Sequence, residues 1–243
     1  MTKENKNGFY DELLKGSFPT TINTQVQEDD VIVEPANVGS PDDDEDDEDS
    51  SGYTLISASP ERSNTFDEID YGINIDDSII YLHGDISMGS LFDLIAKTRI
   101  ILNNRPEEDA DKPITILLNS NGGDVYEANG MVDYIESLDV KVNIIARGRA
   151  LSAAALLLCS ATGLRAASKS TVIMIHESSA EFAGRSSDIK ANADHIDELE
   201  TIFYKRLEEL SNQNEDFWRK SCRKDFYMTA EKALELGLID KVI

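Results

Sequence analysis

The sequence predicts an α/β fold built around a parallel-rich sheet. Short apolar runs alternate with longer amphipathic segments from residue 78 onward, and one very long amphipathic segment begins near residue 187. Apolar residues make up 40% of the 243 residues, which is enough for one core together with a polar tail.

The short apolar runs, each bounded by polar or turn-forming residues, predict strands at residues 78–82, 114–118, 142–146 and 171–175. The segments between them have helical periodicity and predict helices at residues 91–102, 125–138 and 152–160. Because a helix joins each strand to the next, the strands are expected to pair in parallel.

A single long helix is expected at residues 187–212. Apolar residues recur along it at spacings of three and four, at Ile189, Ala193, Ile196, Leu199, Phe203 and Leu207. So long a helix is expected to protrude from a small domain, and an ordinary surface helix packed on its own core is the alternative. Thr229 is then expected to cap a helix at residues 230–236 that ends at Gly237 and leads into a strand at 238–243.

Residues 1–65 are interpreted as an acidic N-terminal extension that precedes a domain at residues 66–243. Residues 1–70 contain 19 Asp and Glu against 4 Lys and Arg, and residues 42–49 are eight consecutive acids. Such self-repelling sequence predicts a disordered, solvated linker. A removable pro-segment, a gate over a pore and an adaptor-binding arm are the alternatives, and residues 9–14 could form a short docking helix.

Composition excludes several classes of protein. The net charge of −24 disfavours nucleic acid and anionic membranes as partners. No run reaches the roughly 18 apolar residues of a membrane span, and the first residues do not resemble a secretory signal, so a cytoplasmic location is expected. Cys159 and Cys222 lack metal-binding spacing and are expected to be reduced, and no metal or cofactor is expected.

Three residues supply the chemistry of a serine hydrolase. Ser152 lies between an apolar strand and a small, apolar helix, His176 follows another strand, and Asp225 lies near a capped helix. A serine hydroxyl needs an imidazole to accept its proton and a carboxylate to orient that imidazole. The N–H of Ala153 could stabilise an oxyanion, and a second donor is expected from residues 119–123, where two glycines allow a tight turn.

The motifs around these residues resemble the proteolytic subunit of the Clp protease over roughly residues 66–243. The similar segments keep the order of that family and lie at residues 118–123, 148–152, 173–176, 184–189, 225–230 and 233–243. The resemblance implies that Ser152 is the nucleophile, His176 the general base and Asp225 the orienting acid. It further implies that Gly123 and Ala153 are the oxyanion-hole donors.

The resemblance also implies an architecture and partners. It implies a ClpP/crotonase-like fold of repeated β-β-α units with a protruding handle helix. Subunits of this family form seven-membered rings that stack into a chamber, where unfolded polypeptides are cleaved after a separate AAA+ unfoldase delivers them. The chain has no Gly-x-x-x-x-Gly-Lys-Ser/Thr loop, so another chain would supply ATP hydrolysis.

The sequence departs from the family pattern at several positions. Asn121 replaces a usual proline, Glu177-Ser178 replaces Gln-Pro, and Ala153-Ala154 replaces Met-Gly. A carboxylate of Glu177 close to His176 would favour the imidazolium form. Two tyrosines that often line the unfoldase-docking pocket are replaced by Thr115 and Leu117.

Two other histidines compete with His176 for the role of base. His83 precedes Gly84 in an expected loop and His195 lies in the long helix, so both are assigned structural roles. Three other functions stay open. They are a viral capsid-maturation protease of the same fold, a catalytically silent ring subunit, and a crotonase-type acyl-CoA enzyme with a similar oxyanion hole.

Overall fold

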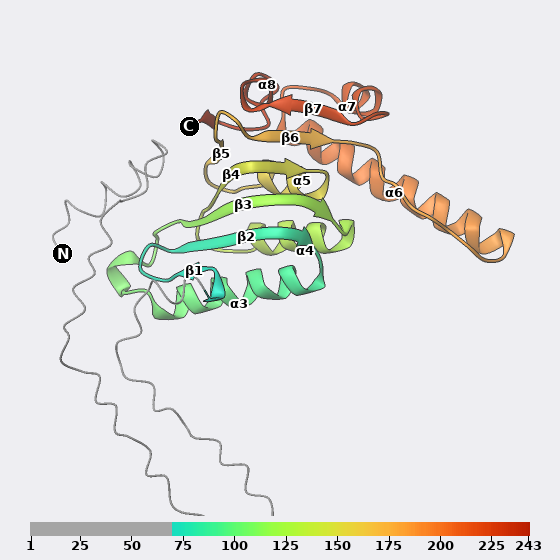
Figure 1. Cartoon of the computed structure of the whole chain (residues 1–243). Coiled ribbons are helices and arrows are strands. Elements are labelled where there is room, and N and C mark those ends of the chain that lie inside the picture. The colour runs from blue at the N-terminus through green and yellow to red at the C-terminus, as the bar shows by residue number, and fades with distance from the viewer. Residues whose placement is uncertain (1–69) are drawn as a thin grey trace, which may run out of the picture. The chain divides into compact units, whose positions relative to one another are not determined.

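The computed structural model describes residues 70–243, and its centre is a mostly parallel sheet (Figure 1). Strands β2 (Ile79–Ile86), β3 (Ile114–Gly123) and β4 (Val142–Leu151) lie side by side and pair in parallel. Helix α3 (Met88–Asn104) joins β2 to β3, and α4 (Val125–Glu136) joins β3 to β4. This arrangement confirms the predicted α/β class with a parallel-rich sheet. The expectations for residues 1–65 lie outside the described residues.

Strand β4 has two different partners along its length. Its residues Ile144, Ile145 and Ala146 pair with a short strand, and Arg149, Ala150 and Leu151 pair with another. The first of these partners is β5 (Arg165–Ala167) and the second is β6 (Val172–Ile175). The other strands are β1 (Ile73–Asn74), β7 (Phe226–Thr229) and β8 (Lys241–Val242). Strand β8 pairs with β5, β7 pairs antiparallel with β6, and β1 pairs antiparallel with β2. The sheet therefore branches beyond Ala146.

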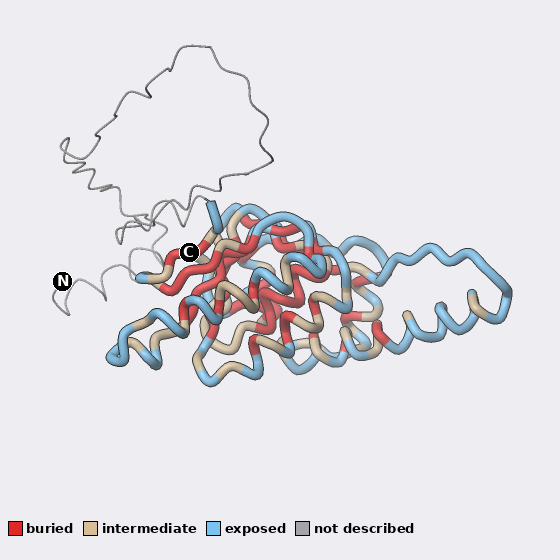
Figure 2. Tube along the Cα trace, turned by 90° about the horizontal axis from the view of Figure 1, so that it is seen from below, coloured by how far each residue is buried: buried red, intermediate tan, exposed pale blue. Residues whose placement is uncertain are grey.

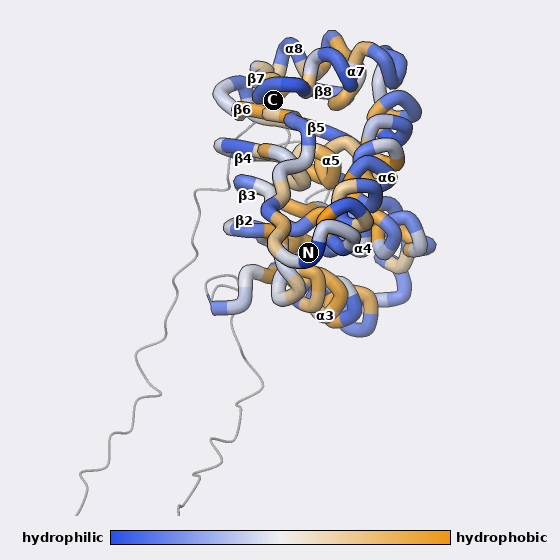
Figure 3. The backbone as a smooth tube through the Cα atoms, turned by 90° about the vertical axis from the view of Figure 1, so that its right-hand side faces the viewer, coloured by the Kyte–Doolittle hydropathy of each residue, from blue (hydrophilic) through white to orange (hydrophobic). Residues whose placement is uncertain are grey.

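Helix α5 (Ala153–Cys159) forms the centre of the core. All of its residues are buried, because its Ala, Leu and Cys side chains carry no charge. It packs on β3 and β4 and against α4. Helices α3, α4 and α5 line one face of the strands (Figure 3), and buried residues concentrate where they meet the sheet (Figure 2).

Helix α6 (Ser186–Leu210) extends beyond the sheet (Figure 1). Its buried residues are Leu199, Tyr204 and Leu207, all in its C-terminal half. The N-terminal half of α6 and residues 177–185 before it form an exposed arm (Figure 2). The structure therefore agrees with the protruding helix, although Ile189 of the predicted apolar stripe is exposed.

The C-terminal part contains both predicted caps. The side chain of Thr229 accepts a hydrogen bond from the Lys232 N–H at 3.2 Å and begins α8 (Ala230–Glu235). Gly237 has a φ of +78° just after this helix, a conformation that glycine adopts readily. Helix α7 (Glu215–Ser221) was not predicted. It is short, and its one fully buried side chain, Trp218, packs edge-on against Phe226 of β7.

Two details of the sequence interpretation need correction. His83 lies within β2 rather than in a loop, because the strand continues past Gly84 through a shift of register between His83 and Asp85. Strand β4 runs on to Leu151 despite Gly148, whose φ of +86° coincides with a shift in the pairing with β3 between Ala146 and Ala150. Both glycines occur where regular pairing is interrupted.

The cysteines and helices agree with the remaining expectations. Cys159 and Cys222 are buried and unpaired, and burial raises the pKa of each thiol to about 12, so neither is a nucleophile near neutral pH. None of the helices between residues 70 and 243 combines the length and apolar content that a membrane span requires.

Arg165, in β5, binds the C-terminal segment of the chain near Asp240. Its guanidinium binds the Asp240 carboxylate at 2.5 Å and donates to the carbonyls of Leu210 and Gly237 at 2.8 and 3.0 Å. Burial alone would raise the pKa of Asp240, but the hydrogen bonds and charge of Arg165 outweigh it and lower that pKa. Because the pKa is lower in the folded state, the ion pair contributes stability above the unfolded pKa of about 4 and loses it as the pH falls through the folded pKa.

We expect Asp240→Asn to lower the free energy of unfolding by about 1 kcal/mol at pH 7, since the half-exposed pair is partly screened by solvent. The difference from wild type should be smaller at pH 3, below the unfolded pKa of Asp240, and should vanish only once the pH is also below its lowered folded pKa. Urea unfolding at both pH values and one protein concentration measures this. Glu235→Gln, which breaks an exposed pair within α8, is the control and should change stability by less than about 0.5 kcal/mol.

Candidate active site

Ser152 occupies a strained turn between β4 and α5. Its φ of +54° makes it one of two non-glycine residues with positive φ in the described part of the chain. Its N–H donates to the Met174 carbonyl at 2.7 Å, and its own carbonyl accepts from the Ala155 N–H at 2.9 Å. Such a backbone conformation costs about 1 to 3 kcal/mol and persists because the strand and helix on either side fix it. The predicted strand, turn and helix around Ser152 are therefore all present.

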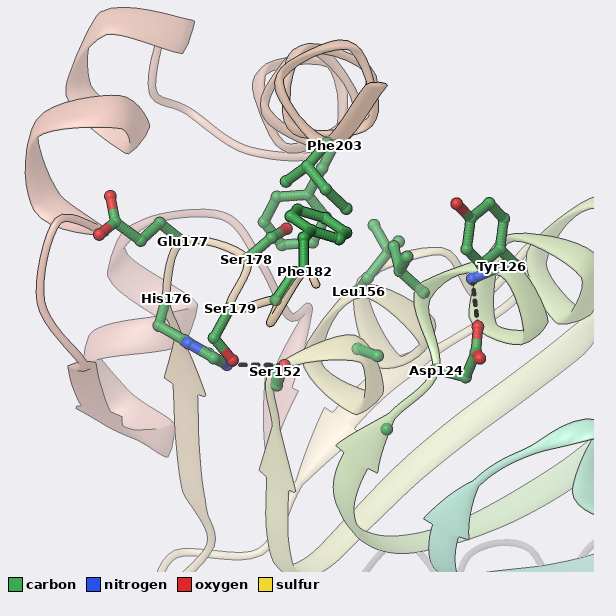
Figure 4. Close-up of a pocket in the computed structure, with 15 residues that line it drawn as sticks. Asp124, Tyr126, Ser152, Leu156, His176, Glu177, Ser178, Ser179, Phe182 and Phe203 are labelled. Atoms are coloured by element: carbon green, nitrogen blue, oxygen red, sulfur yellow. Dashed lines mark hydrogen bonds between the residues drawn. The ribbon is translucent and has the colours of Figure 1, made fainter. Parts of the chain in front are cut away.

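His176 contacts Ser152 directly. Its Nε2 lies 2.8 Å from the Ser152 Oγ (Figure 4). His176 follows β6, and β6 pairs in parallel with the end of β4, so the carboxyl ends of two neighbouring strands carry the two side chains. The distance is that of a hydrogen bond through which an imidazole accepts a serine proton.

Asp225 lies next to His176 in the sheet, but its side chain is turned elsewhere. In the antiparallel ladder Ile175 pairs with Phe226, which puts His176 opposite Asp225. The exposed Asp225 carboxylate accepts a long hydrogen bond from the Tyr227 hydroxyl at 3.5 Å. No hydrogen bond between Asp225 and His176 is present among residues 70–243. The fold therefore brings Asp225 close to His176, but the two side chains are not hydrogen-bonded.

The two glycines that end β3 pack against the serine turn and against β2. A Cβ on Gly122 would collide with the Leu151 carbonyl and crowd Ser152. A Cβ on Gly123 would collide with the backbone of Ile86, and the φ of Gly123 is +151°. The Ser120 hydroxyl accepts from the Gly122 N–H at 3.0 Å and holds this turn. Both positions therefore require glycine.

Ala153 is the first residue of α5, where an N–H has no acceptor within the helix. Gly123, Ser152, Ala153 and His176 all line one pocket, whereas Asp225 does not. An acyl group held at Ser152 would therefore lie within the same pocket as both predicted N–H donors. This arrangement suits chemistry that develops negative charge on a carbonyl oxygen.

The pocket has a volume of about 370 Å³ and a wall that mixes polar and apolar groups. Its larger apolar side chains come from α4, α5, α6 and the segment after His176, and are Val125, Leu156, Phe182, Ile196 and Phe203. Leu156, Phe182 and Phe203 are labelled in Figure 4. A pocket of this size accommodates a peptide side chain next to the serine. Residues 70–243 contain no cluster of His, Cys, Asp or Glu suited to hold a metal ion.

Glu177 does not approach the imidazole of His176. Its exposed side chain is directed away from the hydrogen bond between Ser152 and His176 (Figure 4). The hypothesis that this carboxylate acts on His176 at close range is therefore not supported.

Sequence reasoning missed the part of the site that α6 contributes. Ile196 and Phe203 are seven residues apart on α6, two turns, and so face the pocket together. His195, assigned a structural role, has its Nε2 2.9 Å from the hydroxyl of Tyr126, another pocket residue, and stacks on that ring. The periodicity of α6 was visible in the sequence, but its neighbours were not.

Comparison with known proteins finds one matching family and several relatives. The family model described as Clp protease matches residues 64–243. The chain is 36% identical over 137 residues to the ATP-dependent Clp protease proteolytic subunit 2 of Synechococcus sp., covering 56% of this chain and 70% of the relative. It is 32% identical over 174 residues to the subunit 2 of Frankia casuarinae, covering 71% and 78%. It is 35% identical over 136 residues to the subunit 1 of Prochlorococcus marinus, covering 56% and 69%.

We expect Gly123→Ala to reduce the rate of acylation at Ser152 by about 100-fold or more, because the added methyl group displaces a predicted oxyanion donor. The reaction of Ser152 with an activated ester, followed by intact mass, measures this rate. Gly89→Ala is the matched control, since a methyl group there meets only the Ser87 side chain at 3.7 Å. Equal rates for the two variants would contradict the assignment of Gly123.

Proposed function

This chain belongs to the Clp protease family, and we propose that it hydrolyses peptide bonds with Ser152 as nucleophile, His176 as general base and Asp225 as the orienting acid. It is a serine endopeptidase of the Clp proteolytic-subunit type. The observation that carries the residue assignment is the 2.8 Å contact between the Ser152 Oγ and the His176 Nε2 at a strained turn.

The proposed reaction begins when the Ser152 Oγ attacks the scissile carbonyl and His176 Nε2 takes its proton. The N–H groups of Gly123 and Ala153 stabilise the oxyanion that forms. His176 then returns the proton to the leaving amine, which leaves an acyl group on Ser152. Water, activated by the same imidazole, releases this group and restores the serine.

This cycle requires a hydrogen on the His176 Nδ1, because Nε2 must accept from serine. We infer that the Asp225 carboxylate turns from Tyr227 to this Nδ1–H in the reacting enzyme. The ladder register supports this, since it puts the two residues opposite each other at the ends of β6 and β7.

Assembly and partners follow from the family. We propose seven-membered rings that stack through the α6 arm into a cytoplasmic chamber for unfolded polypeptides. The exposed N-terminal half of α6 supports such contacts. The relatives' names describe them as ATP-dependent, and this chain has no phosphate-binding loop, so we propose a separate AAA+ unfoldase. Residues 1–65 are proposed to be an extension outside the peptidase domain.

Maturation of a viral capsid is a second candidate role for the same peptidase. Thr115 and Leu117, which replace the usual docking tyrosines, are both buried in β3. The acidic run at residues 42–49 would also suit a protease that acts without an unfoldase. Copurification with capsid protein would favour this role, and copurification with an AAA+ unfoldase would favour the first.

A fluorophosphonate probe should label wild-type protein at Ser152, as measured by intact mass and peptide mapping. Ser152→Ala should remove the label and all useful turnover while the protein remains folded, since losing a triad nucleophile costs on the order of 10⁴-fold or more. An assembled wild-type protein that resists the probe would contradict the active-peptidase assignment and favour a silent subunit. Labelling that does not require Ser152 would identify a different nucleophile.

Asp225→Asn should lower kcat for peptide cleavage by roughly 10⁴-fold near pH 7, because the amide stabilises the wrong tautomer of His176. Fluorogenic peptide hydrolysis measures the effect. Asp139→Asn, at an exposed position outside the site, is the control and should leave kcat near the wild-type value. A similar kcat for both variants would show that Asp225 does not orient the base.

A further inference from the structure

Two consecutive backbone N–H groups after His176 donate hydrogen bonds to two different segments of the chain. The Glu177 N–H donates to the Cys222 carbonyl at 2.8 Å, on the segment that leads to Asp225. The Ser178 N–H donates to the Glu200 Oε1 of α6 at 2.6 Å. The backbone that carries His176 is therefore attached both to the segment before β7 and to α6.

Other restraints on this backbone are few. Residues 177–187 are exposed, so little apolar packing holds the chain between β6 and α6 (Figure 2). A hydrogen bond from a backbone N–H to a charged carboxylate is stronger than one between neutral groups. The Glu200 contact is consequently a principal restraint on the residues that follow His176.

Glu200 is itself fixed at a well-packed point of α6. The next residue, Thr201, accepts from Arg219 Nη2 of α7 at 2.9 Å. Arg219 lies 5.0 Å above the ring of the buried Tyr204 and binds Glu215 at 2.6 Å. This part of α6 is held to α7, in contrast to the exposed N-terminal half of the helix, so the carboxylate of Glu200 can act as a fixed anchor.

The charges near Glu200 agree with its position at the base of the loop. Burial raises the pKa of Cys222, and Glu200 and Glu177 raise it further. Burial followed by Glu200 also raises the pKa of Tyr204. Both carboxylates therefore lie beside the residues that pack under the loop. No other interaction of the Glu200 carboxylate competes with the Ser178 N–H among those of residues 70–243.

We propose that Glu200 is a positioning residue, which holds His176 Nε2 toward Ser152 by binding the Ser178 N–H. The inference rests on the proposed role of His176 as general base. It requires a residue with a backbone N–H at position 178, which serine supplies and proline would not.

The test is the rate at which a fluorophosphonate labels Ser152 in the assembled full-length protein. Glu200→Ala should slow labelling about tenfold while the final extent stays at one label per chain, because the base is misoriented in every molecule. A variant that merely unfolds part of the protein would instead lower the final extent. Glu200→Gln, which keeps an acceptor oxygen, should restore most of the rate. Glu208→Ala removes an exposed acid from the same helix and is the matched control.

A double-mutant cycle with Ser178→Pro tests the route of the effect. Since this variant has no N–H at position 178, adding Glu200→Ala should not slow labelling further. The proposal is overturned if Glu200→Ala labels as fast as Glu208→Ala, or if it slows labelling equally in the Ser178→Pro background. If Glu200→Ala assembles poorly, Glu200→Asp, which keeps the charge but shortens the reach, should give an intermediate rate, and a wild-type rate would contradict the proposal. Absence of labelling in wild type would overturn the proposed function itself, a result distinct from both.

Discussion

The pairing of β4 with β6 is the interaction on which the site depends. Ser152 ends β4 and His176 follows β6, and the ladder from Arg149 to Leu151 brings these two ends to hydrogen-bonding distance. The same β4 strand pairs with β5 over its first half, so it has to change partners near Gly148. The pocket is lined by Ser152 and Ala153, where β4 ends and α5 begins, and by His176 after β6. The pairing of β4 with β6 therefore determines both the local sheet topology and the position of the pocket.

Most of these strands and helices could be predicted from the sequence, because each depends on a pattern of neighbouring residues. Apolar periodicity predicted β2, β3, β4 and the helices between them, and the flanks of Ser152 predicted its turn. Strands β5 and β7 and helix α7 were missed because they are short and owe their structure to partners distant in sequence. The motif around Asp225 predicted that this residue would lie near His176. It could not predict the hydrogen bond of its side chain to Tyr227, because that contact is not encoded by a local sequence pattern.

Helix α6 protrudes at its N-terminal half and lines the pocket further along, and its sequence does not distinguish these two parts. Its apolar stripe continues with the same spacing from Ile189 to Leu207, yet only the C-terminal part is buried by α7 and the core. The half-buried residues Ile196 and Phe203 face the pocket, and Glu200 on the same helix contacts the loop after His176. Periodicity reports that a face is apolar, whereas what covers that face is set by tertiary and quaternary contacts.

The strained turn at Ser152 has an evolutionary consequence. A positive φ is tolerated by glycine at far lower cost than by serine, so stability alone would favour a glycine at this position. With Ser152 as the proposed nucleophile, selection for the hydroxyl acts continuously against selection for stability. In a lineage that no longer needed proteolysis, mutational drift would replace Ser152 early, whereas Gly122 and Gly123, which the packing of the backbone requires, would persist as a record of the lost activity.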